Sequence, residues 1–276
     1  MSEIWCNGEW LPAANYPGAA QDRGAFLGLG LFETMLALDG ALVFADRHLA
    51  RLHASCERLG WCIDLPDLRE IAAALLVRNQ LSTDRARLRL IVTGGSGAHN
   101  DLTPGADRLI WLAAFPCGEV PETTSLCISP WPRNERSPLA GLKTACYAEN
   151  IIALDQARRL GFGETVFLNT VGHLCENATA NLFLVKNGVL LTPSLDSGCL
   201  PGIGRDVVCE LAAAHGISCE QRSLDLADLH AADEIFLTSS TRGPIGVSRL
   251  EERELASGPL TGLLRELWLS EIRRGR

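Results

Sequence analysis

Residues 164–193 have the sequence ETVFLNTVGHLCENATANLFLVKNGVLLTP, in which short apolar stretches alternate with turn signals. Asn187-Gly188 lies between the apolar stretches 182–185 and 189–191. An Asn-Gly pair at such a place is typical of a two-residue type I′ hairpin turn. Residues 164–193 therefore predict a run of short strands joined by turns.

Segments with helical and strand patterns flank this stretch on both sides. Leu49, Leu52, Cys56 and Leu59 recur at helical spacing, and Gly60 follows as a stop signal. Strands mixed with helices and hairpin turns predict an α/β chain of the mixed α+β kind, not one parallel βαβ series. Further helices are expected in residues 67–79, 148–161, 204–216 and 260–274, and further strands in residues 87–95, 107–115, 125–129 and 233–240.

Residues 115–123, FPCGEVPET, contain two prolines and a glycine and show no periodicity. The chain of 276 residues also exceeds the usual size of a single domain. We therefore expect a small N-terminal lobe over residues 1–117, a linker over residues 118–123 and a larger C-terminal lobe over residues 124–276.

The composition, with 47% hydrophobic and 21% charged residues, is ordinary for a globular protein with a core. A net charge of −8 argues against binding to nucleic acids or anionic membranes. No apolar run is long enough to span a bilayer, and the first residues, MSEIWCNGEW, do not resemble a signal peptide. We therefore expect a cytoplasmic protein.

Ten cysteines are present, but none of them forms a C-x-x-C pair. Several, such as Cys56 and Cys209, stand among apolar residues, where a thiol behaves as a small hydrophobic group. The six histidines show no metal-ligand spacing with the cysteines. The sequence therefore predicts neither a disulfide framework nor a metal site.

Only two of the 25 basic residues are lysines, Lys143 and Lys186. Lys186 precedes the predicted hairpin turn, where we expect it in solvent. Lys143 stands among small and apolar residues in PLAGLKTACY. A desolvated ammonium can lose its proton and act as a base or a Schiff-base nucleophile, whereas a guanidinium cannot. Two interpretations stay open at this point: a need for amine chemistry, or the remainder of an arginine-rich composition.

Four further polar features lie near predicted turns. Arg51 is on a helix, and Glu176 lies between apolar stretches. LPGIGRD (200–206) leads into a helix, whose free N–H groups and dipole suit an anion, and TSSTRG (238–243) places hydroxyls and an arginine after a strand. Each feature also has an interpretation without a functional role. Arg51 then belongs to a solvated helix face, Glu176 is a loop carboxylate, and the two segments are common turns.

Taken together, these features meet the requirements of pyridoxal 5′-phosphate chemistry. The phosphate needs anion donors, the aldehyde needs a lysine, and the pyridine nitrogen needs a carboxylate that keeps it protonated. Lys143, Glu176, Arg51 and the two turns supply these groups, so the residues alone support this cofactor as a hypothesis.

The chain resembles the class IV aminotransferases, a fold-type IV family that includes branched-chain and D-amino acid aminotransferases and 4-amino-4-deoxychorismate lyase. The resemblance implies a two-lobed fold, pyridoxal 5′-phosphate held at the junction of the lobes, and a homodimer. It covers nearly the whole chain in the family's order and rests on DRGAFLGLGLFET (22–34), RHLARLHAS (47–55), the Lys143 segment, CENATANLF (175–183) with LLTP (190–193), and LPGIGRD (200–206).

The resemblance also implies roles for particular residues. Lys143 carries the cofactor, Glu176 pairs with the pyridine nitrogen and Tyr147 lies near the phenolic oxygen. Gly204 stands where the family usually has threonine, which keeps the backbone donor but loses a hydroxyl. The implied phosphate contacts are Arg51, the backbone N–H groups of Ile203 and Gly204, Ser240 and Thr241.

The subfamily is not decided by these motifs. The spacing from Lys143 to Tyr147, FET at 32–34 and STRG at 240–243 resemble the lyases. The usual carboxylate-trapping arginines of D-amino acid aminotransferases are missing from VTGGSGAHND (92–101). Candidate substrate-binding residues are Phe32, His99 and Arg242, the last two as partners of a carboxylate.

We expect an aminotransferase that moves an amino group between a small amino acid or amine and a 2-oxo acid. The alternative is a 4-amino-4-deoxychorismate lyase, which releases pyruvate and 4-aminobenzoate from aminodeoxychorismate. A third possibility is a catalytically silent homologue used as a binding protein, which the presence of both Lys143 and Glu176 disfavours.

Overall fold

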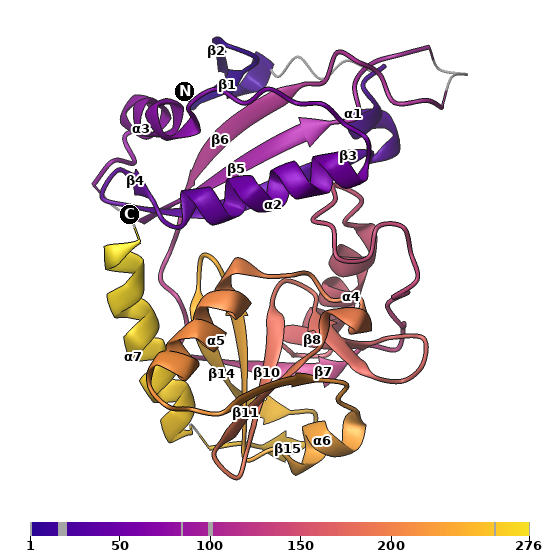
Figure 1. The fold of residues 1–276 in the computed structure, drawn as a ribbon, viewed down its shortest axis with the longest axis vertical. Coiled ribbons are helices and arrows are strands. Elements are labelled where there is room, and N and C mark those ends of the chain that lie inside the picture. The colour runs from indigo at the N-terminus through magenta and orange to yellow at the C-terminus, as the bar shows by residue number, and fades with distance from the viewer. Residues whose placement is uncertain (1, 16–20, 84, 99–101, 257, 276) are drawn as a thin grey trace. The chain divides into compact units, whose positions relative to one another are not determined.

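The computed structural model, drawn in Figure 1, describes residues 2–15, 21–83, 85–98, 102–256 and 258–275. The chain forms two compact units. Unit 1 consists of residues 1–118, 142–147 and 272–276, and unit 2 consists of residues 119–141 and 148–271.

Unit 1 is built on a six-stranded sheet in the order β2-β1-β6-β5-β3-β4, in which every pair is antiparallel. The two longest strands, β3 and β5, pair in register from Gly30↔Thr93 to Leu38↔Arg85. The strands are β1 (Glu3–Cys6), β2 (Glu9–Pro12), β3 (Gly30–Leu38), β4 (Ala41–Leu42), β5 (Arg85–Thr93) and β6 (Ile110–Pro116).

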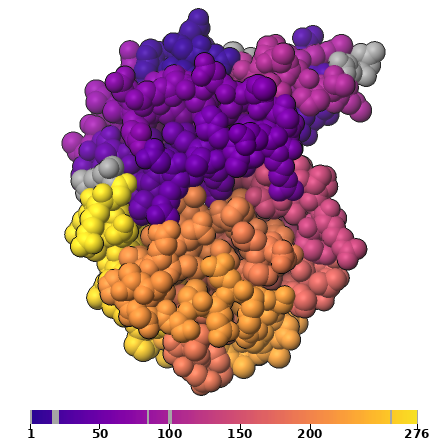
Figure 2. Space-filling model, viewed as in Figure 1, coloured from indigo at the N-terminus to yellow at the C-terminus, as the bar shows by residue number. Residues whose placement is uncertain are grey.

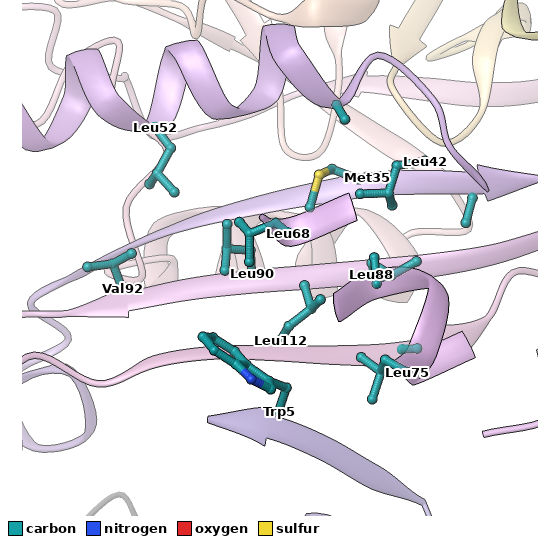
Figure 3. Close-up of a cluster of buried hydrophobic side chains, with 14 of the residues drawn as sticks. Trp5, Met35, Leu42, Leu52, Leu68, Leu75, Leu88, Leu90, Val92 and Leu112 are labelled. Atoms are coloured by element: carbon teal, nitrogen blue, oxygen red, sulfur yellow. The ribbon is translucent and has the colours of Figure 1, made fainter. Parts of the chain in front are cut away.

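The core of unit 1 lies between one face of this sheet and two helices, α2 (Ala45–Arg58) and α3 (Leu68–Arg78). Figure 3 shows the core side chains, among them Leu52 from α2 and Leu88 and Leu90 from β5. Because side chains alternate along a strand, the arginines of β5 lie on the opposite face. Two short helices, η1 (Ala13–Asn15) and α1 (Arg23–Leu27), complete the unit.

Unit 2 contains a nine-stranded mixed sheet in the order β12-β11-β10-β13-β14-β7-β8-β9, with β15 paired to β14. The pairs β11–β12, β14–β7 and β7–β8 are parallel, and the others are antiparallel. The strands are β7 (Thr123–Ile128), β8 (Glu164–Leu168), β9 (Leu174–Asn177), β10 (Asn181–Lys186), β11 (Val189–Pro193), β12 (Cys219–Arg222), β13 (Glu234–Ser239), β14 (Gly243–Leu250) and β15 (Arg253–Glu254).

The remaining helices are α4 (Ala148–Arg159), η2 (Leu195–Ser197), α5 (Ile203–Ala214), α6 (Leu226–Ala231) and α7 (Pro259–Arg274). Buried leucines, isoleucines and valines of β7, β8, β10, β13 and β14 form the main core of unit 2. Within the described ranges, no helix combines the length and the hydropathy that crossing a bilayer requires.

The structure confirms the predicted mixed α+β fold and the hairpin at its centre. Asn187 and Gly188 have φ values of 49° and 76°, and the flanking residues Lys186 and Val189 face each other across β10 and β11. Positive φ at both central residues is what a type I′ turn requires, and an Asn-Gly pair adopts it at little cost.

The expected lobes, 1–117 and 124–276, differ from the two units in where residues 142–147 and 272–276 belong. Residues 142–147, which the sequence analysis places in the larger lobe, belong to unit 1. Their backbone pairs with β3, because Phe32 N–H donates to Lys143 O (2.9 Å) and Ala145 N–H donates to Gly30 O (2.8 Å). This contact between residues more than one hundred positions apart leaves no local signal in the sequence.

Candidate active site

Lys143 lies on the segment that pairs with the start of β3. A β-bridge joins Leu31 to Thr144, and the two backbone hydrogen bonds on either side of it hold Lys143 in a defined position. Lys143 is half-buried. These backbone hydrogen bonds to β3 therefore fix the point from which the Lys143 side chain extends.

Two aromatic rings surround the Lys143 amine within unit 1. Its Nζ lies 4.4 Å from the centre of the Phe32 ring and 6.0 Å from the centre of the Tyr147 ring. The two rings meet edge to face, with centres 5.5 Å apart. Ring faces attract an ammonium electrostatically and exclude water from it, so the amine has a fixed and partly dry environment. The structure thus brings together three residues that the sequence analysis named.

Arg51 is held by Glu33 of β3, which the sequence analysis includes in FET (32–34) without giving it a role. Arg51 Nε donates to Glu33 Oε1 (2.8 Å) and Nη2 donates to Oε2 (2.6 Å), a bidentate pair that fixes the plane of the guanidinium. The ring of His48, one turn before Arg51 on α2, lies with Nδ1 2.7 Å from Glu33 Oε2. Arg51 is therefore oriented before any ligand arrives.

Glu33, Arg51 and His48 form a buried group whose members differ in their tendency to carry a charge. Burial by itself would raise the pKa of Glu33, but the Arg51 guanidinium and the hydrogen bonds from His48 and Arg51 outweigh it and lower the pKa to about 2. Burial lowers the pKa of His48, and the nearby positive charges of Arg51 and Lys143 act in the same direction. The group is thus an ionised Glu33–Arg51 pair beside a histidine that is biased towards its neutral form.

Arg89 of β5 is a second residue to which the sequence analysis gives no role. Its guanidinium lies 5.1 Å from the centre of the Phe32 ring, and its register partner on β3 is Thr34. Its Nε is buried and has no hydrogen-bond partner among the described residues, and burial, followed by the charge of Arg87, lowers its pKa. A half-buried cation without a carboxylate partner in the described chain is suited to an anionic ligand.

Glu176 of β9 accepts a backbone hydrogen bond at one carboxylate oxygen and lies near a guanidinium at the other. Leu200 N–H donates to Oε2 (3.0 Å), and Oε1 lies 3.9 Å from Nη2 of Arg133. Arg133 in turn stacks over Phe167, 4.4 Å from the ring centre, and its Nη1 donates to Asn150 Oδ1 (3.2 Å). A stacked guanidinium thus faces the carboxylate that the resemblance pairs with a pyridine nitrogen.

Ile203 and Gly204 form the first turn of α5, as the sequence predicts. The N-cap residue, Gly202, makes no side-chain hydrogen bond to this turn, so no side chain covers the free N–H groups from that position. Helix N-termini of this kind bind anions through their N–H groups and the helix dipole. The turn is braced by Asn181, whose Nδ2 donates to Leu200 O (2.9 Å).

The space beside Gly204 explains why a glycine is used there. A Cβ added to Gly204 would lie 2.9 Å from Thr238 Oγ1 and 3.1 Å from the carbonyl carbon of Ser239. Thr238 Oγ1 is buried and lacks a hydrogen-bond partner in the described chain. Ser240 and Thr241 are the next residues, in the turn that joins β13 to β14. Glycine at 204 therefore keeps the α5 N-terminus close to a hydroxyl-rich turn.

Arg242 is the last residue of this turn and donates hydrogen bonds to other residues of unit 2. Its Nη2 donates to Thr179 Oγ1 (2.7 Å) and its Nε donates to Ser239 Oγ (3.2 Å). The same Nη2 lies 3.9 Å from Oε1 of Glu164, a carboxyl that is 2% exposed and accepts a hydrogen bond from Thr179. Burial raises the pKa of Glu164. Arg242 thus has structural contacts, and its role towards a substrate stays a prediction.

The remaining candidate, His99, lies outside the described residues. Among those that are described, no cluster of histidine, cysteine, aspartate and glutamate could hold a metal ion. Each unit by itself holds groups that suit a pyridoxal phosphate: unit 1 has an oriented amine at Lys143, and unit 2 has a carboxylate at Glu176 and, near the N-terminus of α5, the Thr238 hydroxyl, which lacks a hydrogen-bond partner in the described chain.

The chain is similar to known proteins over most of its length. The model of the family described as amino-transferase class IV matches residues 30–250. The branched-chain-amino-acid aminotransferase of Escherichia coli K12 is 30% identical, over 94% of this chain and 89% of its own length. The solved structure of a branched-chain aminotransferase from Thermoproteus uzoniensis with norvaline has a TM-score of 0.91 at 25% identity, covering 99% of this chain and 95% of that one.

A solved structure of a different activity is similar as well. It is a protein of Legionella pneumophila assigned provisionally as a 4-amino-4-deoxychorismate lyase. It is 31% identical, with a TM-score of 0.86, and the match covers 92% of this chain and 94% of that one. Proteins of this fold that are similar in sequence therefore include named aminotransferases and one putative lyase.

Proposed function

Because this chain belongs to the class IV aminotransferases, whose members depend on pyridoxal phosphate, we propose that it is an aminotransferase acting on a small amino acid or amine and a 2-oxo acid. The observation that carries the proposal is the position of Lys143. Its backbone is tied to β3 and its amine lies beside the rings of Phe32 and Tyr147, within the residues that the family model matches.

In this proposal Lys143 has two tasks. Its Nζ would hold the cofactor covalently and, as a free amine, would take the proton from the substrate Cα. Pyridoxal phosphate, when bound, supplies the electron sink for that step. Glu176 holds the proton on the pyridine nitrogen, and Arg133 and the Leu200 N–H keep its carboxylate oriented. Tyr147 is the candidate partner of the phenolic oxygen.

The phosphate contacts in the proposal come from groups that are set before binding. The N–H groups of Ile203 and Gly204, at the uncapped start of α5, and the hydroxyls of Ser240 and Thr241 supply neutral donors. Thr238 Oγ1, which lacks a partner among the described residues, adds a further donor from the segment TSSTRG (238–243). Arg51 supplies the positive charge, in the orientation that Glu33 imposes.

Two arginines are candidates for the substrate carboxylate. Arg242 already donates to Thr179 and Ser239. Arg89 lies against Phe32, whose ring also contacts the Lys143 amine, and has no carboxylate partner in the described chain. We infer that Arg89 is the stronger candidate, because binding a carboxylate there breaks none of the hydrogen bonds found among the described residues.

A 4-amino-4-deoxychorismate lyase is the second candidate function. The similarity to the Legionella pneumophila protein favours it, as does the spacing between Lys143 and Tyr147. The two activities share the removal of the Cα proton and differ in the next step, because a lyase releases pyruvate from its substrate and needs no oxo-acid acceptor.

The half-reaction separates the two candidates. The purified holoenzyme is mixed with a panel of L- and D-amino acids and amines in the absence of any 2-oxo acid, and the cofactor absorbance is recorded. An aminotransferase converts its cofactor to the pyridoxamine form with at least one donor. Unchanged absorbance with every donor, together with pyruvate release from aminodeoxychorismate, assigns the lyase activity instead.

The family resemblance also supports a homodimer, and a cytoplasmic location stays a prediction from the sequence. Light scattering coupled to size-exclusion chromatography tests the dimer. A mass near twice that of one chain is expected, and a mass equal to one chain contradicts it.

A further inference from the structure

The thiols of Cys209 and Cys219 lie in contact, although nothing in their sequence spacing predicts it. Their Sγ atoms are 3.5 Å apart. Cys209 lies on α5 and Cys219 is the first residue of β12, and both are half-buried. Atoms of the orange segment that contains α5 lie at the surface of the face seen in Figure 2. Small reagents in solvent can therefore reach this part of unit 2.

The turn between the helix and the strand explains why the two thiols meet. The helix ends at Ala214, and Gly216 adopts a left-handed φ of 70°. Ile217 N–H then donates back to Ala212 O (2.9 Å), which reverses the chain. After this reversal β12 pairs in parallel with β11, starting at Leu190↔Cys219. The strand thus returns alongside the helix and brings Cys219 to Cys209.

A buried cation stands next to this pair. The Arg205 side chain is 2% exposed, and its Nη2 donates to Pro193 O (3.1 Å) and Gln221 Oε1 (3.0 Å). Gln221 Nε2 in turn lies 3.8 Å from Cys209 Sγ. A fixed positive charge near a thiol stabilises the thiolate, which is the reactive form. Arg205 therefore favours ionisation at the pair.

The two thiols differ in their tendency to ionise. The hydrogen bond with Cys209 lowers the pKa of Cys219 below the ordinary thiol value, and the charge of Arg205 acts in the same direction. The same hydrogen bond, together with burial, raises the pKa of Cys209. Cys219 also lies in the edge strand β12, whereas Cys209 lies in the middle of α5, so Cys219 is the better candidate for the nucleophile of the pair.

From this geometry we propose that Cys209 and Cys219 form a reversible thiol–disulfide site that reacts with hydroperoxides. The Cys219 thiolate attacks one peroxide oxygen, the O–O bond breaks, and a protonated leaving oxygen departs as water, which leaves a sulfenic acid. The Cys209 thiol then attacks that sulfur and a second water leaves. Two thiols are oxidised to one disulfide while one hydrogen peroxide is reduced to two waters, so atoms and electrons balance.

Little movement is needed to close the bond. A disulfide has an S–S distance of about 2.0 Å, so the Sγ atoms must approach by roughly 1.5 Å from their contact distance of 3.5 Å. The bond would tie the middle of α5 to the edge strand β12. The other cysteines provide internal comparisons, because Cys62 and Cys146 are exposed thiols for which the described chain shows no sulfur contact.

The sequence makes the test direct. Trypsin cleaves after Arg205 and Arg222 and at no position between them, so both cysteines fall in the single peptide 206–222, DVVCELAAAHGISCEQR. The full chain, with any bound cofactor in place, is treated with hydrogen peroxide, alkylated with iodoacetamide and digested with trypsin. The masses of the resulting peptides are then measured by mass spectrometry. The expected product is this peptide lighter by two hydrogen atoms and unalkylated. Dithiothreitol before alkylation should restore both carbamidomethyl groups.

Single variants test the assigned roles. In Cys209→Ser, Cys219 should stop at a sulfenic acid that dimedone traps, whereas in Cys219→Ser the Cys209 thiol should stay reduced and alkylatable. A Cys62→Ser variant serves as a control and should form the disulfide as the unmodified chain does. The proposal is overturned if peptide 206–222 keeps both thiols while Cys62 or Cys146 is oxidised, or if Cys219 pairs with another cysteine.

Discussion

Glu33 holds the Arg51 guanidinium by two hydrogen bonds, from Nε to Oε1 at 2.8 Å and from Nη2 to Oε2 at 2.6 Å. Glu33 is 1% exposed, and Arg51 is the cation that the proposal assigns to the cofactor phosphate. A guanidinium that is already oriented loses less side-chain entropy when it binds a phosphate. Glu33 is therefore a positioning residue for Arg51.

Glu33→Gln should weaken the binding of pyridoxal phosphate by about tenfold or more, because an amide cannot accept from both Nε and Nη2 of Arg51. Binding of pyridoxal, which lacks the phosphate, should change little. Dissociation constants of both compounds are measured by the absorbance change on addition to the apoprotein. Asp46→Asn, at an exposed ion pair with Arg69, is the matched carboxylate-to-amide control. An equal loss for both compounds would leave Glu33 with a structural role only.

The pH dependence of stability offers a second test of the same pair. The pKa of Glu33 is about 2 in the folded chain, below its ordinary value of 4.5. A carboxyl whose pKa is lowered by folding adds stability above the unfolded-state pKa, and this stability is lost as the pH falls through the folded-state pKa. The stability difference between the unmodified chain and Glu33→Gln should therefore be full above about pH 4.5 and shrink towards pH 2. Urea unfolding across that range measures it, and a constant difference contradicts the assignment.

Arg133 and Glu176 should act as one unit. Glu176→Gln should leave cofactor binding roughly intact and lower turnover by orders of magnitude, because a neutral amide cannot hold the proton on the pyridine nitrogen. Arg133→Met should lower kcat by about tenfold in the unmodified chain but by less than about twofold in the Glu176→Gln background. Additive losses in this double-mutant cycle would show that Arg133 acts only through Asn150 and Phe167. Thermal unfolding of each variant reports that structural contribution separately.

Arg89 and Arg242 can be distinguished by paired substitutions. Arg89→Leu should raise the Michaelis constant for a carboxylate-bearing substrate by about tenfold or more, as the loss of a charge-assisted hydrogen bond of about 1.5–3 kcal/mol implies. Arg242→Leu should instead lower the thermal unfolding midpoint, because the buried Glu164 loses the nearby cation. Arg249→Leu, at a half-buried arginine whose Nη2 donates to Gly161 O, is the control. A tenfold rise for Arg242→Leu with normal kinetics for Arg89→Leu reverses the two roles.

Much of the fold can be predicted from local patterns. The Asn187-Gly188 turn and the helix that ends before Gly60 are predictable because φ preferences and helical spacing act over a few residues. The order of such elements predicts the mixed α+β class. The membership of residues 142–147 in unit 1 could not be predicted in this way, because it rests on backbone bonds to Gly30 and Phe32.

Local sequence patterns likewise predict only part of the candidate site. Lys143 stands out by composition, and Glu176 and the α5 turn by motif. Glu33 and Arg89 do not, because what distinguishes them is a partner on another element: Arg51 of α2 for Glu33, and the Phe32 ring for Arg89. The alternation of arginines in RARLRLIVT (85–93) is the one available signal for Arg89, since it places them opposite the core-facing leucines.

Covalent labelling of Lys143 tests the central claim most directly. The purified protein should be yellow, and borohydride should fix the cofactor on one lysine. Modification blocks trypsin at Lys143, so the labelled peptide should be 137–158, SPLAGLKTACYAENIIALDQAR, with its internal lysine uncleaved. Lys186, the other lysine, is the internal control and should be unlabelled. Label on Lys186, or a purified protein that takes up no chromophore when pyridoxal phosphate is added, contradicts the account.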